Sequence, residues 1–572
     1  MSPGPVQVPH QQVRPPRHMN CPAHVYTRIQ AGTAPVQMPY KECGQADSMD
    51  SHIMRIVVVG GTAAGWTAAA RLASAFRETV SVTVLETPSG ADHQETGQVT
   101  ALGPQIQRDL FDRLGVLEDE WMRACCASFN AAVRYVNWRT GGAAEIAART
   151  TVSGGVDHFY NPCAGIPECE GSLLSEHWQY RRMNGETVEP FDYACFREPP
   201  LMDARKSPRW LDGRAAVPYG WHVDIHMFTQ YLRNVATGRF GVRAVRGELL
   251  HAERDADGMI TLLHTAEGRA VPGEFFLDCT GAEGLLIAGM LQEPFVEAQD
   301  RLLCDSAVTV TVPHDHTTHG IDPFTTATAL PAGWAWKMPL PGRFGAGHVY
   351  ARDWTEPDEA VGTLCALWGL RPGRTAVRHI ALRTGRSRRA WVKNCVAVGP
   401  SACSLEPLAG DTLGGVLGAL DRLVRDFPSR DDPEGPAARF NRAAETAHAR
   451  ARDFAQLLYR TAPRADTPFW RAQRELPLSA ELAECLAAHR AGLAPDAHEL
   501  AYAGVLAALA PGRSAPRAAL AHRQDARDVA DAHFLRIKRQ QQILLETLPT
   551  AQHYLQRLHT RPMPQPAGAG PL

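Results

Sequence analysis

The stretch Ile56-Val57-Val58-Val59-Gly60-Gly61-Thr62-Ala63-Ala64-Gly65-Trp66 decides the fold. An apolar strand runs into a glycine turn and then into an alanine-rich helix, and a second strand follows that ends in an acid. This order aims a helix N-terminus at a diphosphate and places a carboxylate near a ribose hydroxyl. The stretch therefore predicts a Rossmann-type unit whose cofactor-binding residues are Gly60, Gly61, Ala64, Gly65 and Glu86.

One position of the glycine motif departs from the usual pattern. The middle glycine of G-x-G-x-x-G is Thr62. A Cβ at this position is expected to enter the space where the backbone approaches the phosphates. The sequence therefore predicts weakened or lost dinucleotide binding, and a βαβ unit that holds no dinucleotide stays open as an alternative.

Outward from this unit, strand-like and helical segments alternate. This interleaving favours an α/β core with a mixed β-sheet domain attached, followed by a helical region. The expected strands are 81–85, 274–278, 307–312 and 395–398, and the final long helix carries Val529, Ala532, Phe534, Ile537 and Leu544 on its apolar face.

Four parts of the chain are predicted from composition and periodicity. Residues 1–53 are rich in Pro, Gln and His and are expected to be a disordered extension, with Met49 or Met54 as alternative starts. The body of the fold is expected at 54–435, the helical region at 436–560 and a loose tail at 561–572.

Composition excludes several classes of protein. The 572 residues carry 59 Lys+Arg and 61 Asp+Glu, so the net charge of −2 gives no footprint for nucleic acid or an anionic membrane. No apolar run approaches the ~20 residues that span a bilayer. The 13 cysteines never form C-x-x-C, which argues against a disulfide framework or a thiolate zinc site. We expect a reduced, cytoplasmic protein.

A tryptophan-rich segment carries a family resemblance. Gly333-Trp334-Ala335-Trp336-Lys337-Met338-Pro339 resembles the W-x-W-x-I-P signature of flavin-dependent tryptophan halogenases. Segments similar to the same family run from about Met54 to the C-terminal helix, which implies a flavin monooxygenase-like FAD-binding fold with an inserted substrate domain. They are 136–139, 157–160, 188–195, 221–224, 278–281, 304–308, 389–392 and 466–470.

The resemblance implies a particular chemistry. In the family, reduced FAD from a separate reductase reacts with oxygen and a bound halide to give hypohalous acid. A lysine and a glutamate then direct the halogen onto the indole of tryptophan, and backbone amides hold the halide near the flavin. By position, Gly97, Trp334, Trp336 and Pro407 are the further flavin-site residues that the resemblance implies.

The two residues that carry the family's chemistry are replaced. Asn130 stands where the lysine is expected, and a neutral amide cannot supply a cation or form a haloamine. Ala409 stands at the glutamate of E-P-L-E-S-T-G, while Glu406 before it is retained. Asp411 could substitute if the register slips by two residues. In the direct register it falls at the halide position, where a carboxylate ~4 Å from chloride repels it by about 4 kcal/mol at an effective dielectric of 20.

Other family positions are eroded as well. The flavin loop G-V-G-E-A-T reads 95–100 here and has Gln98 in place of its glutamate. The family's histidine and phenylalanine after D-H-F-Y become Asn161 and Cys163. The run that clamps tryptophan is shortened to 499–505, where Tyr502 alone is expected to remain. Asn161, Cys163 and Tyr502 are the predicted substrate residues, and free tryptophan is a doubtful substrate.

Two further groups of residues are weak candidates for a functional site. His314, His316 and His319 have a spacing that could meet a metal, but they follow Pro313 in a polar loop, and we expect no metal site. The cysteines 125 and 126 are expected to pack as small apolar residues.

Three readings remain open. The first is a repurposed enzyme on the halogenase fold that acts on an indole or another aromatic metabolite in specialised biosynthesis, with or without FAD. The second, least favoured, is a working halogenase with replacement catalytic groups. The third is a non-catalytic homologue that binds a ligand or pairs with an active halogenase or reductase. A homodimer is compatible with each of them.

Overall fold

The nucleotide-binding unit is a six-stranded sheet built around the glycine turn. The computed structural model describes residues 52–88, 98–140, 157–409, 412–429, 434–496, 499–510 and 517–560. β1 (Arg55–Val59) is buried and lies between two parallel neighbours, as an apolar strand in a doubly wound sheet does. The strand order is β10 (Arg243–Arg246), β2 (Ser81–Glu86), β1, β14 (Phe275–Asp278), β23 (Cys395–Ala397) and β22 (Trp391–Val392).

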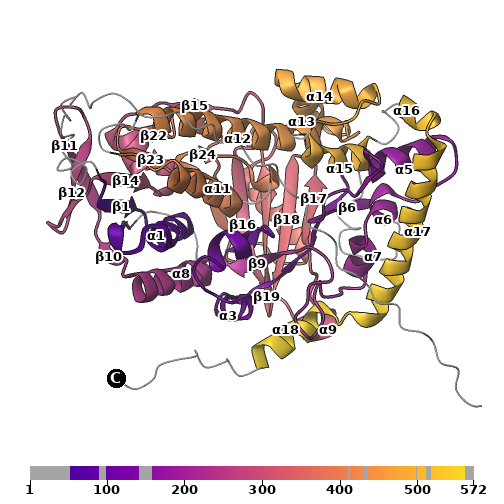
Figure 1. Cartoon of the computed structure of the whole chain (residues 1–572), viewed down its shortest axis with the longest axis horizontal. Helices are drawn as coiled ribbons and strands as arrows, with labels where there is room; N and C mark the ends of the chain where they lie inside the picture. The colour runs from indigo at the N-terminus through magenta and orange to yellow at the C-terminus, as the bar shows by residue number, and fades with distance from the viewer. Residues whose placement is uncertain are drawn as a thin grey trace, which may run out of the picture. The chain divides into compact units, whose positions relative to one another are not determined.

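Helices cover this sheet. α1 (Ala63–Phe76) packs against α8 (Ile225–Phe240) and α11 (Thr412–Arg425), because alanines and Leu72 fill its buried face. β1, α1 and β2 form the βαβ order that the opening stretch predicts (Figure 1). The predicted fold class, an α/β FAD-binding-type domain with a mixed sheet and a helical C-terminal region, is confirmed.

A seven-stranded mixed sheet forms the second body. Its central strands are β18 (Gly333–Leu340), which carries the two tryptophans of the sequence motif, and its antiparallel partner β19 (Arg343–Tyr350). The order is β20 (Arg378–Ala381), β16 (Ser306–Pro313), β19 (Arg343–Tyr350), β18 (Gly333–Leu340), β17 (Thr325–Leu330), β5 (Ala132–Val136) and β6 (His158–Pro162).

Smaller sheets connect and extend the two bodies. The first, β3 (Val99–Leu102), β9 (Gly220–Asp224) and β4 (Ser128–Asn130), carries residue 130 at its edge. The others are β11 (Leu249–Arg254) with β12 (Ile260–Thr265) and β13 (Ala270–Pro272), β15 (Phe295–Glu297) with β21 (Gly385–Ser387) and β24 (Cys403–Ser404), and β7 (Glu168–Cys169) with β8 (Ser172–Leu173).

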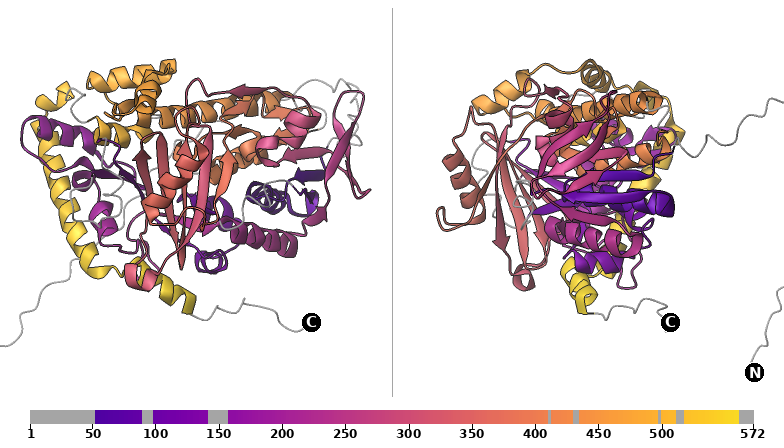
Figure 2. Two further views of the ribbon diagram at one scale, coloured as in Figure 1. Left: turned by 180° about the vertical axis from the view of Figure 1, so that it is seen from behind. Right: turned by 90° about the vertical axis from the view of Figure 1, so that its left-hand side faces the viewer.

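Helices gather in the C-terminal part of the chain. α17 (Gln524–Thr547) runs beside α5 (Leu174–Met183), α6 (Phe191–Cys195) and α7 (Glu198–Asp203) (Figures 1 and 2). The other helices are α3 (Glu118–Ala124), α9 (His316–His319), α10 (Pro357–Trp368), α12 (Glu434–Thr461), α13 (Pro468–Glu475), α14 (Ala480–Arg490), α15 (Leu500–Leu509), α16 (Ala518–Ala521) and α18 (Ala551–Thr560).

The predicted face of the last long helix is partly wrong. Phe534, Ile537 and Leu544 are buried, whereas Val529 and Ala532 are exposed. The buried row of α17 instead continues toward the N-terminus through Ala526 and Ala530, four residues apart, because a helix returns to the same face at that spacing. Among the described helices, none has the length and apolar content needed to cross a bilayer.

Candidate active site

The turn after β1 brings backbone segments too close for side chains. Gly60 has φ +112, and a Cβ there would lie 2.4 Å from the carbonyl oxygen of Cys279. A Cβ on Gly65 would lie 2.0 Å from the carbonyl oxygen of Gly60. These two positions therefore require glycine, and the turn presents the N-terminus of α1 in the way that a diphosphate site needs.

The side chain of Thr62 is directed into the fold. Its Oγ1 donates to the carbonyl oxygen of Cys279 at 3.0 Å and accepts from the N–H of Gly65 at 3.2 Å. Thr62 is thus the N-cap of α1, a role for which threonine is well suited. The Thr62 hydroxyl, at a position where the motif usually has glycine, is therefore hydrogen-bonded within the fold. Its effect on phosphate binding stays a prediction.

Glu86 ends β2, as the sequence predicts, and both of its carboxylate oxygens are engaged. Arg233 donates from Nε to Oε1 at 2.8 Å, and Arg246 donates from Nε to Oε2 at 3.1 Å. The Arg233 guanidinium also lies over the Trp66 ring. Each carboxylate oxygen thus already accepts one hydrogen bond from an arginine.

The flavin loop is described only in part. Gly97 lies outside the described residues, and so does the rest of 89–97. Gln98 is described, and its carbonyl oxygen accepts from the N–H of Ile225 at 3.1 Å, at the start of α8.

Asn130, which the resemblance aligns with the family's lysine, is buried at the end of β4. Its Oδ1 accepts from the backbone N–H of Thr325 at 3.0 Å and from the Thr325 hydroxyl at 3.3 Å. The side chain therefore acts as an acceptor that ties β4 to β17.

A buried histidine continues this network. His222 Nε2 lies 2.8 Å from the Thr325 hydroxyl, and Nδ1 lies 3.3 Å from the hydroxyl of Ser128. Burial lowers the pKa of His222 to about 3, so the imidazole is neutral. The four side chains Ser128, His222, Thr325 and Asn130 form a chain of neutral polar groups without a cation.

The three predicted substrate residues line one cavity. Asn161, Cys163 and Tyr502 surround a space of about 630 Å³ between β6, α12 and α15. The Cys163 thiol donates to the carbonyl oxygen of Asn130 at 3.3 Å, so the cavity wall touches Asn130. Further lining side chains are Phe196, Arg450 and Phe454.

The buried carboxyl group of Glu406 lies just before the short helix that holds Ala409. Glu406 Oε2 accepts from the Tyr459 hydroxyl at 3.1 Å. Burial raises the pKa of Glu406 to about 7, and hydrogen bonding from Tyr459, Cys304 and Trp334 offsets this only in part. Ala409 belongs to the short helix η6 (Pro407–Ala409), and Asp411 lies outside the described residues.

The other predicted residues are distributed over both bodies. Trp334 is buried in the core of the seven-stranded sheet, whereas Ala64 belongs to the core around α1. The Trp336 ring lies against Gly347, and Pro407 is exposed. The role of these residues in flavin binding stays a prediction.

The histidine loop is held by backbone contacts. His314 Nε2 lies 3.0 Å from the carbonyl oxygen of Gly320, and His316 Nδ1 accepts from the N–H of Gly342 at 3.1 Å. Each contact engages one of the two nitrogens of its ring, and the expected absence of a metal site stays a prediction.

Known proteins show the same architecture. A family model described as tryptophan halogenase matches residues 55–521. Tryptophan 7-halogenase RebH from Lentzea aerocolonigenes is 42% identical over 534 residues, covering 90% of this chain and 100% of the relative. The chain belongs to the tryptophan halogenase family. The resemblance inferred from the motifs is thereby confirmed.

Other members of the tryptophan halogenase family agree. Tryptophan 6-halogenase ThaL from Streptomyces albogriseolus is 40% identical and covers 89% of this chain and 99% of its own length. The solved tryptophan 6-halogenase SttH from Streptomyces toxytricini superimposes with a TM-score of 0.79 at 34% identity, over 88% of this chain and 99% of that one. Tar14, a flavin-dependent tryptophan C-6 chlorinase, gives 0.81 at 33% identity, over 89% of this chain and 100% of that one.

For this family member, reasoning from sequence missed the polar network around Asn130. His222 lies within a strand segment that resembles the family, but Thr325 stands far along the chain and shows no motif. Arg450 and Phe454, which line the cavity, lie on α12. No sequence motif on the polar exposed face of this helix marks them. Only the register between β5 and β17 and the packing of α12 bring these residues to the site.

Proposed function

We propose that this chain is a flavin-dependent enzyme of specialised metabolism that acts on an indole or another aromatic substrate, without halogenation directed by a lysine. The family supplies the scaffold, and the residues at the site argue for altered chemistry. The experiment below separates this proposal from a working halogenase and from a non-catalytic binding partner.

The β1–α1 turn supports a flavin. Gly60, Gly61 and the N-terminus of α1 would hold the diphosphate of FAD, and the inward hydroxyl of Thr62 is compatible with this. Glu86 would accept a hydrogen bond from the ribose beside its contacts with Arg233 and Arg246. Reduced FAD, delivered by a separate reductase, would supply the electrons that activate oxygen.

The proposal depends on the neutral, hydrogen-bonded side chain of Asn130. Its side chain is neutral and accepts two hydrogen bonds from Thr325. The nearest histidine of the network, His222, is neutral as well. These groups can hold or orient a polar atom, but they cannot hold a halogen on an amine or place a cation beside it.

The cavity supports an aromatic substrate. Phe196, Phe454 and Tyr502 offer apolar ring surfaces, and the Phe454 and Tyr502 rings lie 6.2 Å apart. Asn161 adds an amide that can donate and accept, and Arg450 adds a positive charge at the exposed rim. Few polar groups around an apolar wall are typical of small-molecule sites.

A flavin titration followed by product analysis tests the proposal. The purified full-length protein is titrated with oxidised and reduced FAD while its visible spectrum is recorded. It is then incubated in air with a flavin reductase and a set of indoles, with and without halide. We expect bound flavin and substrate turnover that does not depend on halide.

Each other outcome contradicts the proposal. A product that contains halogen and forms only with halide would identify a working halogenase. Failure to bind either form of FAD would remove the proposed oxidant and favour the non-catalytic partner. Flavin binding without turnover of any indole or other aromatic compound would contradict the proposed substrate class.

A further inference from the structure

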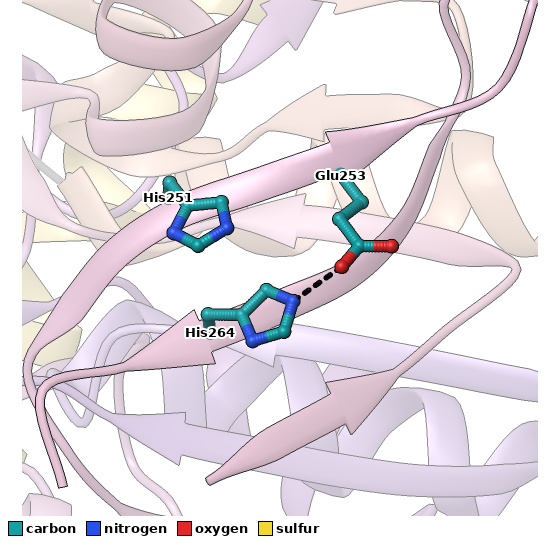
Figure 3. A group of neighbouring side chains, drawn as sticks. All are labelled: His251, Glu253 and His264. Carbon is teal, nitrogen blue, oxygen red and sulfur yellow. Dashed lines mark hydrogen bonds and ion pairs between the residues drawn. The ribbon is translucent and has the colours of Figure 1, made fainter. Parts of the chain in front are cut away.

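The sheet formed by β11, β12 and β13 presents three potential metal ligands on one face. His251 and Glu253 are two residues apart on β11, and side chains at this spacing share a face. His264 on β12 is the direct cross-strand partner of His251. The three side chains converge, as Figure 3 shows.

The donor atoms of the three side chains lie close together. One ligand atom from each residue lies within 4.8 Å of the others. His264 Nε2 is 2.6 Å from Glu253 Oε1. The His251 and His264 rings stack with centroids 4.4 Å apart and an angle of 12° between their planes.

We propose that His251, Glu253 and His264 bind a divalent transition metal ion, with zinc as the fitting ion. Two imidazoles and one carboxylate are a donor set that suits zinc, with the fourth position left to water or an external ligand. Glu253 and His251 are exposed and His264 is partly exposed, so an ion in solution can reach all three.

The ion requires donor atoms that lie up to 4.8 Å apart to approach one another and the Glu253 carboxylate to shift. Zn–N and Zn–O distances of about 2.0–2.1 Å in a tetrahedral site place neighbouring donor atoms about 3.3 Å apart. The carboxylate oxygen of Glu253 must therefore withdraw from His264 by less than about 1 Å. Its side chain is 54% exposed and can change rotamer, while the strand register holds the two histidines opposite each other.

This site is separate from the cavity of the proposed function. β11 and β12 lie at one end of the described fold, and β6 and α15 lie toward the other (Figures 1 and 2). A metal ion here would link two strands of the small sheet. The proposed metal site therefore does not depend on the substrate cavity.

Zinc titration of the full-length protein tests the site. The protein is freed of metal with a chelator and titrated with Zn²⁺ against a chromogenic indicator, and Co²⁺ absorption spectra report tetrahedral coordination. The wild type is expected to take up one more equivalent than His251→Ala or His264→Ala. Glu253→Gln is expected to weaken the affinity for this additional zinc ion at least ~10-fold. His379→Ala, an exposed histidine on strand β20, is the matched control and is expected to bind as the wild type does.

Three results would overturn the proposal. The first is equal zinc uptake and equal cobalt spectra in the wild type and both histidine variants. The second is an unchanged affinity in Glu253→Gln, which would remove the carboxylate from the site. The third is an equal loss in His379→Ala, which would show that the effect is not specific to this face. Circular dichroism of each apo variant verifies that its fold is intact.

Discussion

Replacing Glu406 by glutamine examines the buried carboxyl group beside the turn that holds Ala409. Burial raises the pKa of Glu406 to about 7 from its ordinary value of 4.5. The folded protein therefore keeps a proton that the unfolded chain releases between these values. The stability that this protonated group contributes is complete below about pH 4.5 and is lost as the pH rises through about 7.

The span between the two pKa values sets the size of the effect. Each pH unit corresponds to about 1.4 kcal/mol, so the free energy of unfolding of the wild type should fall by about 3 kcal/mol relative to Glu406→Gln across this window. Glutamine keeps an oxygen that can accept from the Tyr459 hydroxyl and has no proton to lose in this range.

Urea unfolding at about pH 5 and about pH 8, followed by tryptophan fluorescence, measures this difference. Glu297→Gln, a half-exposed glutamate on β15, controls for the removal of a negative charge. The reasoning is refuted if Glu406→Gln and the wild type lose stability equally over this interval. A difference of the opposite sign would show that the carboxylate is stabilised in the folded protein.

Three further predictions concern the site. Asn130→Lys alone should not produce halogenated indole in the aerobic reductase assay. Halide incorporation by this variant would contradict the interpretation that a lysine alone is not sufficient at this site. Gly65→Ala should abolish flavin binding and lower the Tm, because its Cβ would lie 2.0 Å from a carbonyl oxygen, whereas Gly238→Ala, in open space on α8, should do neither. Arg450→Ala should raise KM for an acidic aromatic substrate at least ~10-fold with flavin binding unchanged, and Arg442→Ala on the same helix should leave KM unaltered. An equal effect of the two arginine variants on KM would exclude a role for the cavity rim.

The nucleotide-binding unit could be read from the sequence because its signals are local. A strand, a glycine turn, a helix and a second strand stand in register within about thirty residues, and the structure has them as β1, α1 and β2. The face of α17 was only partly predictable. Val529 and Ala532 fit an apolar pattern, but which face of a helix is buried depends on the elements packed beside it.

The site was predictable to the extent that motifs mark it. The family pattern identified Asn161, Cys163 and Tyr502, and the structure places all three around one cavity. The pattern could not reveal that Arg233 and Arg246 occupy the carboxylate of Glu86, because these ion pairs join residues 147 and 160 positions apart. Contacts between residues so far apart in the sequence follow from tertiary packing, and local sequence patterns do not predict them.

The contacts of Asn130 explain why Asn130→Lys alone is not expected to give halogenation. The Thr325 N–H is a buried donor whose acceptor is Asn130 Oδ1. A lysine ammonium is a donor only, so the substitution would leave this N–H facing another donor, at a cost of about 1–3 kcal/mol for the lost acceptor. The neutral His222 of the network offers no negative charge to balance the added cation. The contacts around Asn130 therefore suit an amide, and Asn130→Lys is expected to leave the Thr325 N–H without this acceptor.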